Sequence, residues 1–301
     1  MRALLEYLMK GRARVIVAAA IALIVPPFSV VAGGLVGLST LRYGLAQGAI
    51  VLGGSVLLAA AVTYLALGTV VPIGVYVVCT GLPVLGLGAV LRSTSSQGLT
   101  LAAAALAGGA LVLGIHVLSA DPVAWWQGVL EQVVIGWLHG GGTQLDPRTL
   151  DALRELFAKL APLMISLPAG TVGAAMGVVL LARWWHATLD NPGGFGEEFR
   201  ALRLDRRLAG PTLAIGVLAF AASQALGGLW PALLEVLLVV YAIQGVAISH
   251  ALVKIREASS GWLVGIYLML VLMPPAATTA LAIVGLSDTA LDFRARAAHR
   301  S

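Results

Sequence analysis

Amide and ionisable side chains are rare inside the apolar segments of this sequence, so each one is a candidate for function. Glu235, Gln244 and His250 lie in one such segment, and Gln224 precedes it. Such groups are costly in lipid and often line substrate or proton pathways. We therefore take Glu235, Gln224, Gln244 and His250 as candidate ligand contacts. The alternative is that Glu235 and His250 lie near opposite membrane surfaces, where their charges are tolerated.

Two further polar stretches could bind a partner protein. Phe195 and Phe199 share one face of an amphipathic stretch that follows the turn at 191–194, and the other stretch is the C-terminal run 285–296. Contact with anionic lipids, or ion pairs such as Asp292 with Arg296 at i,i+4 spacing, would explain these residues equally well. The candidate docking residues are Phe195, Phe199, Arg200, Arg203, Asp288, Asp292 and Arg294.

Motifs for catalysis are missing from the sequence. His139-Gly140-Gly141-Gly142 is like the oxyanion strand of lipases, but no Gly-x-Ser-x-Gly nucleophile motif accompanies it. There is no phosphate-binding P-loop, and the single cysteine, Cys79, belongs to no metal or redox motif. We therefore expect no enzymatic activity, no cofactor and no bound metal.

The composition sets the class of protein. The 301 residues are 59% apolar and 11% charged, against about 25% charged in soluble domains, and the mean hydropathy is +0.95. These values exclude a soluble enzyme, a disordered chain and an outer-membrane barrel. The basic residues gather at segment edges rather than on a soluble domain, so we do not expect nucleic-acid binding. The sequence predicts an all-α, polytopic transmembrane bundle.

The apolar segments give the expected helices. A membrane span needs about 20 apolar residues, and six segments meet this length. Two longer segments are each interrupted by a Pro-Pro pair, at Pro26-Pro27 and Pro274-Pro275. We predict about eight helices in one integral membrane domain, 1–301. The six clear segments are 45–66, 69–91, 98–119, 161–183, 208–229 and 231–252, and the two broken ones are 15–41 and 261–286.

The distribution of basic residues predicts the orientation. Arg and Lys collect on the cytoplasmic side of membrane proteins, which places the basic loop 184–207 and both termini in the cytoplasm of a bacterial inner-membrane protein. This requires each Pro-Pro segment to return to the same face, as a helical hairpin or a re-entrant pair. A kinked single span is the alternative. Segment 120–160 is then external and amphipathic, either a lid over the outer surface or a pair of interfacial helices.

Several short motifs follow one another along the chain. They are Arg42-Tyr43-Gly44 with Gly48, Asn191-Pro192 with Phe195, Glu198-Phe199-Arg200 with Arg203-Leu204, Gln244-Gly245 with His250, Trp262-Leu263 with Tyr267, and Gly285-Leu286 with Asp288, Asp292-Phe293-Arg294 and Arg296. Together these motifs resemble the YybS-like family of predicted bacterial membrane proteins, a domain of unknown function. The glycine pattern after Arg42-Tyr43 is also distantly similar to the substrate-binding subunits of energy-coupling-factor vitamin transporters and to the rod-shape protein MreD.

The two distant similarities imply two functions. The transporter resemblance implies a small-molecule-binding or transport subunit, with ATP hydrolysis supplied by a separate module. The resemblance to MreD implies a non-enzymatic membrane organiser in envelope or cell-shape machinery. The expected partners are the lipid bilayer, a small-molecule ligand, and a membrane or cytoplasmic protein.

Overall fold

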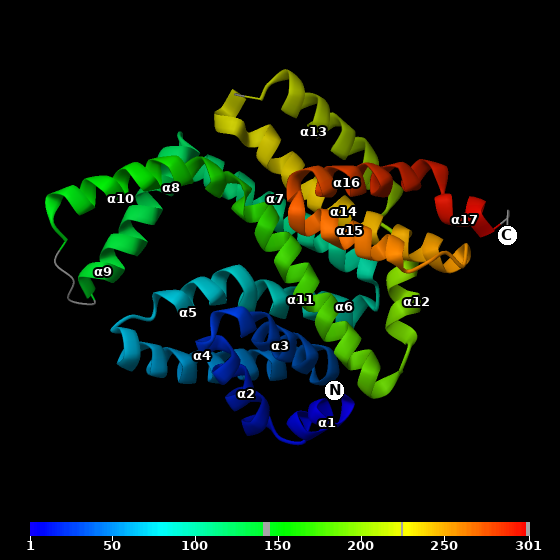
Figure 1. Ribbon diagram of the computed structural model, residues 1–301, viewed down its shortest axis with the longest axis horizontal. Helices are drawn as coiled ribbons and strands as arrows, with labels where there is room; N and C mark the ends of the chain where they lie inside the picture. Colours follow the sequence, from blue (N-terminus) through cyan, green and yellow to red (C-terminus); the bar gives the residue numbers. More distant parts are fainter. Residues whose placement is uncertain (141–144, 224, 299–301) are drawn as a thin grey trace.

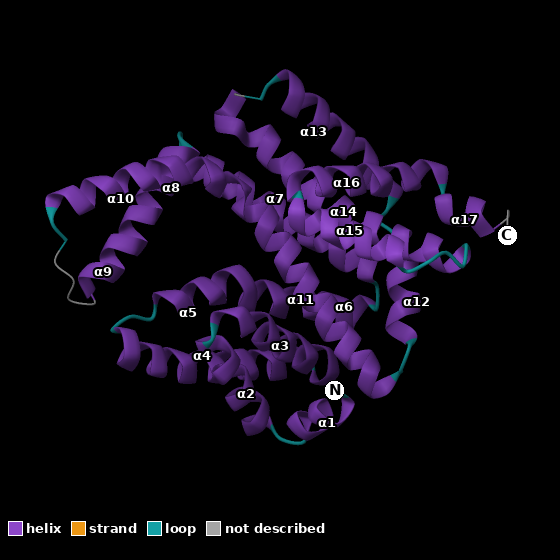
Figure 2. Ribbon diagram, in the orientation of Figure 1, coloured by secondary structure: helices purple, strands orange, loops and turns teal. Residues whose placement is uncertain are grey.

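Helices account for every regular element in the part of the chain that the structure describes (Figure 2). The computed structural model describes residues 1–140, 145–223 and 225–298. A helix satisfies its own backbone hydrogen bonds, which lipid cannot do. The helices, including 3-10 and π turns labelled η, are α1 (Arg2–Met9), α2 (Arg12–Ile24), η1 (Pro26–Phe28), α3 (Ser29–Tyr43), α4 (Leu45–Leu67), α5 (Val71–Tyr76), η2 (Val77–Gly81), α6 (Leu82–Thr94), α7 (Gln97–Leu118), α8 (Pro122–Leu130), η3 (Glu131–Ile135), α9 (Gly136–Gly140), α10 (Pro147–Leu160), η4 (Ala161–Ser166), α11 (Leu167–Asp190), α12 (Gly194–Ala201), η5 (Arg206–Leu208), α13 (Ala209–Ala221), η6 (Ala225–Gly228), α14 (Leu229–Ile255), α15 (Gly261–Leu272), α16 (Pro274–Leu291) and α17 (Phe293–Ala298).

Five of the helical runs in the described residues are long and apolar enough to cross a membrane, which makes the chain a multi-pass membrane protein by length and composition. They match five of the six clear segments expected from the sequence. These runs are Leu45–Leu67, Val71–Thr94, Gln97–Leu118, Pro147–Asp190 and Ala225–Ile255.

The sixth expected segment, 208–229, is not one continuous span. Its main helix, α13, has 13 residues and ends at Ala221. The backbone of Gly227 and Gly228 then has φ of +63° and +83°, a left-handed conformation that glycine adopts without steric cost. Helix α13 has already ended, since Ala222 has φ −131° and ψ 41°, and the two glycines lie in the turn before α14. The expected count of six clear spans is therefore not confirmed.

The first Pro-Pro segment is a helical hairpin. Proline has no N–H and interrupts a helix, and α2 and α3 are separated by the 3-10 turn η1 at Pro26–Phe28. The Tyr43 hydroxyl, at the end of α3, donates to the Met9 carbonyl, just before α2, at 3.4 Å. The two ends of the segment therefore lie together, as in the hairpin interpretation.

The second Pro-Pro segment also returns to the end from which it starts. The chain turns at Met273, which has φ −137° and ψ 60°, and Figure 1 shows α15 and α16 running back and forth beside α14. Tyr267 of α15 contacts His250 near the end of α14. Asp292, just past α16, pairs with Arg203 on the neighbouring segment.

Helices α11 and α14 hold the bundle together. Helix α14 packs against α16, α11, α7 and α13, with Val236, Val240 and Ile248 almost fully buried. Val236 and Val240 belong to a buried apolar cluster, to which helix α11 supplies Met176. It also supplies Trp185 to a second buried cluster that surrounds α3. Both clusters therefore share one long helix.

The segment expected to be external folds into short helices, as predicted. Asp121 caps α8, and Asp146 caps α10 by accepting from the Thr149 amide at 3.0 Å. Helix α10 buries Phe157 on its apolar face. Figure 1 shows α9 and much of α10 projecting beyond the other helices at the left.

Candidate functional site

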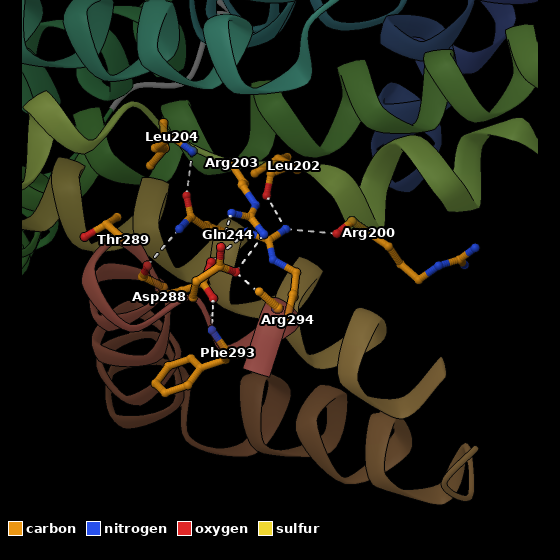
Figure 3. A network of polar contacts seen from close by, with 12 residues as sticks. Arg200, Leu202, Arg203, Leu204, Gln244, Asp288, Thr289, Phe293 and Arg294 are labelled. Atoms are coloured by element: carbon orange, nitrogen blue, oxygen red, sulfur yellow. Dashed lines mark hydrogen bonds and ion pairs between the residues drawn. The ribbon is translucent and has the colours of Figure 1, made fainter. Parts of the chain in front are cut away.

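Gln244 is at the centre of a buried polar network between α14, α16 and the segment after α12 (Figure 3). Its side-chain oxygen accepts from the Leu204 amide at 2.7 Å. Its side-chain nitrogen donates to the Gly285 carbonyl at 2.8 Å. The side chain is 1% exposed. Gln244 therefore joins three segments of backbone and does not face a ligand cavity.

Arg294 extends the network from α17. It donates to the carbonyls of Arg200 and Leu202, both at 2.9 Å, and to the Asp288 carboxylate at 2.7 Å. Asp288 also accepts from the Phe293 amide at 2.9 Å. Arg294 and Asp288 are 6% and 3% exposed. This ion pair is buried and used within the chain, so neither side chain offers its charge to the surface.

Asp292 forms the outer part of the network with Arg203. The two side chains make a bidentate pair at 2.8 and 2.9 Å, the strong geometry for a guanidinium and a carboxylate. Because Arg203 donates to it, the pKa of Asp292 falls from 3.8 to about 2, and the same bond raises the pKa of Arg203. The sequence suggested Arg296 as the partner of Asp292, but Arg203 takes that place.

An aromatic group borders the network. The rings of Phe195 and Phe199 stack with centroids 5.8 Å apart, and the rings of Phe199 and His250 are nearly perpendicular, with centroids 5.6 Å apart. His250 is hydrogen-bonded to the Tyr267 hydroxyl at 2.9 Å. Phe199, a candidate docking residue, and His250, a candidate ligand residue, therefore lie in one aromatic patch. Tyr267 was not among the predicted site residues, although it belongs to one of the motifs.

The three candidate ligand residues that the structure describes, Glu235, Gln244 and His250, do not form one site. Glu235 is half-buried on α14 and has no hydrogen bond or ion pair with another described residue. It lies about 13 Å along the helix from Gln244. Gln224 lies outside the described residues, as do Gly141 and Gly142. The structure thus brings Gln244 and His250 to the network and leaves Glu235 apart.

Three arginines line a second polar feature, which we call the arginine pocket. It is a cavity of about 400 Å³ whose polar lining residues are Arg42, Arg92, Ser95, Arg183, His186 and Glu198. In the sequence, the basic residues that line this cavity indicate only the orientation of the chain in the membrane.

Ion pairs and hydrogen bonds hold most of these side chains in place. Arg183 pairs with Glu198 and lies 3.0 Å from the ring nitrogen Nδ1 of His186. Arg42 pairs with Asp190 at 3.2 Å, and Arg92 donates to the Leu41 carbonyl. The contributing elements are α3, α6 and the consecutive helices α11 and α12, which come from three distant parts of the sequence. Only the fold brings these charges together.

The segments that carry the orienting charges meet at one end of the bundle. Gln97 contacts Glu198 at 3.5 Å, which joins the start of α7 to α12, and the pairs at Arg42 and Arg203 join further segments. At the opposite end, Gly227 lies against Pro122. This arrangement is the one that the charge pattern predicts. We call the charged end the basic end, and its segments are 1–14, 42–47, 92–98, 183–208, 254–256 and 292–298.

No group of three or more histidine, cysteine, aspartate or glutamate side chains in the described residues is arranged to hold a metal ion. Comparisons of the chain with models of protein families, with curated proteins and with solved structures find no match. The resemblance to the YybS-like family therefore stays a prediction from the motifs.

Proposed function

We propose that this chain is a non-enzymatic membrane organiser that presents its basic end to an acidic partner protein. The observation that carries the proposal is the buried network, in which Gln244 and Arg294 hold the backbone of residues 200–204. A surface segment fixed in this way is ordered before it binds, and an ordered surface loses less conformational entropy on association.

Exposed charges at the basic end indicate the chemistry of the partner. Arg206 and Arg207 follow the fixed segment directly, and Lys254 and Arg256 end α14. All four side chains are exposed, and none forms an ion pair with another described residue. Unpaired positive charges attract an acidic surface and speed its association. The partner is therefore a protein with an acidic face.

The candidate docking residues have two roles in this proposal. Arg203, Asp288, Asp292 and Arg294 bond within the chain and shape the surface from below. The stacked pair Phe195 and Phe199 lies half-buried beside them and supplies apolar area. The exposed arginines, Arg206 and Arg207, make the direct contact with the partner.

Charge reversal at the exposed arginines tests this proposal. Arg206→Glu with Arg207→Glu should abolish rescue of a strain that lacks this protein, while the amount of protein in the membrane stays normal. A photo-crosslinker in place of Arg207 should then capture a protein with an acidic face. The matched control reverses Arg148 and Arg154, which are exposed on α10. Equal loss of rescue in both double variants would contradict the proposal.

Transport is a second candidate function, and Glu235 is the observation that favours it. A half-buried carboxylate without a partner among the described residues, inside an apolar helix, is a typical feature of substrate or ion pathways. Under this proposal, Glu235→Gln abolishes rescue and Arg206→Glu with Arg207→Glu does not. Glu131→Gln on the external segment serves as the control for loss of a carboxylate.

A further inference from the structure

The arginine pocket brings more positive charge together than its own acidic groups balance. Three guanidinium groups line the cavity, and Glu198 is the one carboxylate in its lining. Asp190 binds Arg42 from outside the lining at 3.2 Å. His186 lies within electrostatic range of all three arginines. Held this close, like charges repel, so an anion in the cavity would stabilise the arrangement.

Arg92 is the guanidinium that is left without a carboxylate. Glu198 binds Arg183, and Asp190 binds Arg42. No acidic side chain among the described residues lies within ion-pair distance of Arg92, which donates one N–H to the Leu41 carbonyl. Its remaining donors bond to no other side chain or backbone group in the described part of the chain, and they belong to a side chain that lines the cavity.

The residue types select the kind of anion. A guanidinium offers a planar fork of N–H donors that matches the oxygens of phosphate. The Ser95 hydroxyl lines the same cavity and can donate a further hydrogen bond. The cavity lies where α3 and α6 end, at the basic end of the bundle. Basic pockets between helix ends at a membrane surface are suited to phosphate-bearing headgroups.

We infer that the arginine pocket is a binding site for a phosphate group, with Arg92 as its principal contact. The phosphate belongs either to the headgroup of an anionic phospholipid or to a soluble phosphate compound. Arg42, Arg183 and Ser95 complete the site. This inference goes beyond the proposed function, because the partner surface uses Arg206 and Arg207, and either idea can fail without the other.

The experiment uses the full chain in lipid nanodiscs and compares two phosphate sources. In the first arm, nanodiscs of phosphatidylcholine receive increasing fractions of phosphatidylglycerol, and native mass spectrometry counts the lipids retained by each protein. In the second arm, inorganic phosphate is titrated into nanodiscs of phosphatidylcholine alone, and calorimetry measures its binding. The variants are Arg92→Gln and, as a control, Arg256→Gln, an exposed arginine at the same end and outside the cavity.

We expect one saturable site for one of the two sources. Arg92→Gln should weaken binding at least about tenfold, because it removes the charged donor group that contacts the phosphate. Arg256→Gln should leave it unchanged. A site for phosphatidylglycerol identifies a lipid headgroup, and a site for inorganic phosphate identifies a soluble compound.

Two results would overturn the inference. One is that neither source gives a saturable site, and the other is that both variants weaken binding equally, which indicates general attraction to the basic end. If Arg92→Gln does not fold, the wild-type chain provides the test. The phosphate source should then protect Arg92, and not Arg256, from modification by phenylglyoxal, and equal modification of both would overturn the inference.

Discussion

At the scale of single residues, the buried hydrogen bonds of Gln244 predict a large effect on stability. Gln244→Leu keeps the size of the side chain but leaves the Leu204 amide without a partner. It also removes the second hydrogen bond to the Gly285 carbonyl, which lies inside helix α16. An unsatisfied buried group costs about 1–3 kcal/mol. We therefore expect the free energy of unfolding to fall by about 1–3 kcal/mol, measured by equilibrium unfolding in mixed detergent micelles.

The control for this variant is Gln132→Leu, at an exposed position in segment 120–160, which the sequence predicts to be external. Exposed substitutions usually change stability by less than about 0.5 kcal/mol. If the two variants unfold at the same denaturant concentration, the network does not stabilise the basic end.

The pair between Asp292 and Arg203 predicts a dependence of stability on pH. The pKa of Asp292 is lowered from 3.8 to about 2 in the folded chain. The unfolded chain therefore takes up a proton between about pH 4 and about pH 2, so falling pH favours unfolding in that window. Asp292→Asn should reduce the dependence of the melting temperature on pH between about pH 4 and about pH 2, as measured in detergent.

The comparison variant is Glu155→Gln, which removes the carboxylate of an exposed i,i+4 pair with Lys159. It should keep the slope of the wild-type chain. Parallel curves for the wild-type chain and Asp292→Asn would show that the bidentate pair does not contribute.

At the scale of elements, the approach of α14 and α16 depends on two glycines. A Cβ at Gly285 would lie 2.1 Å from the Tyr241 carbonyl oxygen, and one at Gly245 would lie 2.1 Å from the Leu281 carbonyl oxygen. Neither contact is possible, so the helices would have to move apart. Small residues allow this kind of close packing in membranes.

Gly285→Ala should therefore destabilise the chain by about 1–3 kcal/mol, the usual cost of overpacking, measured by the same unfolding experiment. Gly265→Ala on α15 is the matched control, because a Cβ there meets nothing within 4 Å. It should be neutral or stabilising, since alanine favours a helix more than glycine does. A neutral result for Gly285→Ala would contradict the close packing of α14 and α16.

The elements themselves could largely be predicted from the sequence. The expected segments 45–66 and 98–119 correspond to α4 (Leu45–Leu67) and α7 (Gln97–Leu118), because a long apolar run in lipid has little alternative to a helix. Segment 208–229 was wrong as one span. Its apolar composition gives no sign that α13 ends at Ala221, or that the backbone of Gly227 and Gly228 is left-handed before α14.

The candidate site was harder to predict, because its contacts join distant parts of the chain. Periodicity gives the helix face on which Gln244 lies, but not its partners Leu204 and Gly285. It favoured Arg296 for Asp292 because they are one turn apart, whereas the fold provides Arg203. The arginine pocket was missed for the same reason. The distribution of charge along the sequence predicts only that these basic residues gather at one end of the bundle.

At the scale of the whole molecule, the hairpin of α2 and α3 determines which residues share a membrane face. Because the Tyr43 hydroxyl reaches the Met9 carbonyl, the N-terminus lies at the basic end with the loop that holds Arg207. A kinked single span at Pro26-Pro27 would put Arg12 and Arg207 on opposite faces. The structure thus makes the location of Arg12 a test of the topology.

Cysteine labelling in intact cells measures this location. In a Cys79→Ala background, which removes the single native thiol, we introduce Arg12→Cys, Arg207→Cys and Asp151→Cys at three exposed positions. A membrane-impermeant maleimide should label Asp151→Cys from outside, and should label the other two only after the membrane is permeabilised. The positive-inside rule gives this direction. Opposite labelling of Arg12→Cys and Arg207→Cys would overturn the hairpin, whereas a shared reversal of all three would keep the hairpin and invert the orientation.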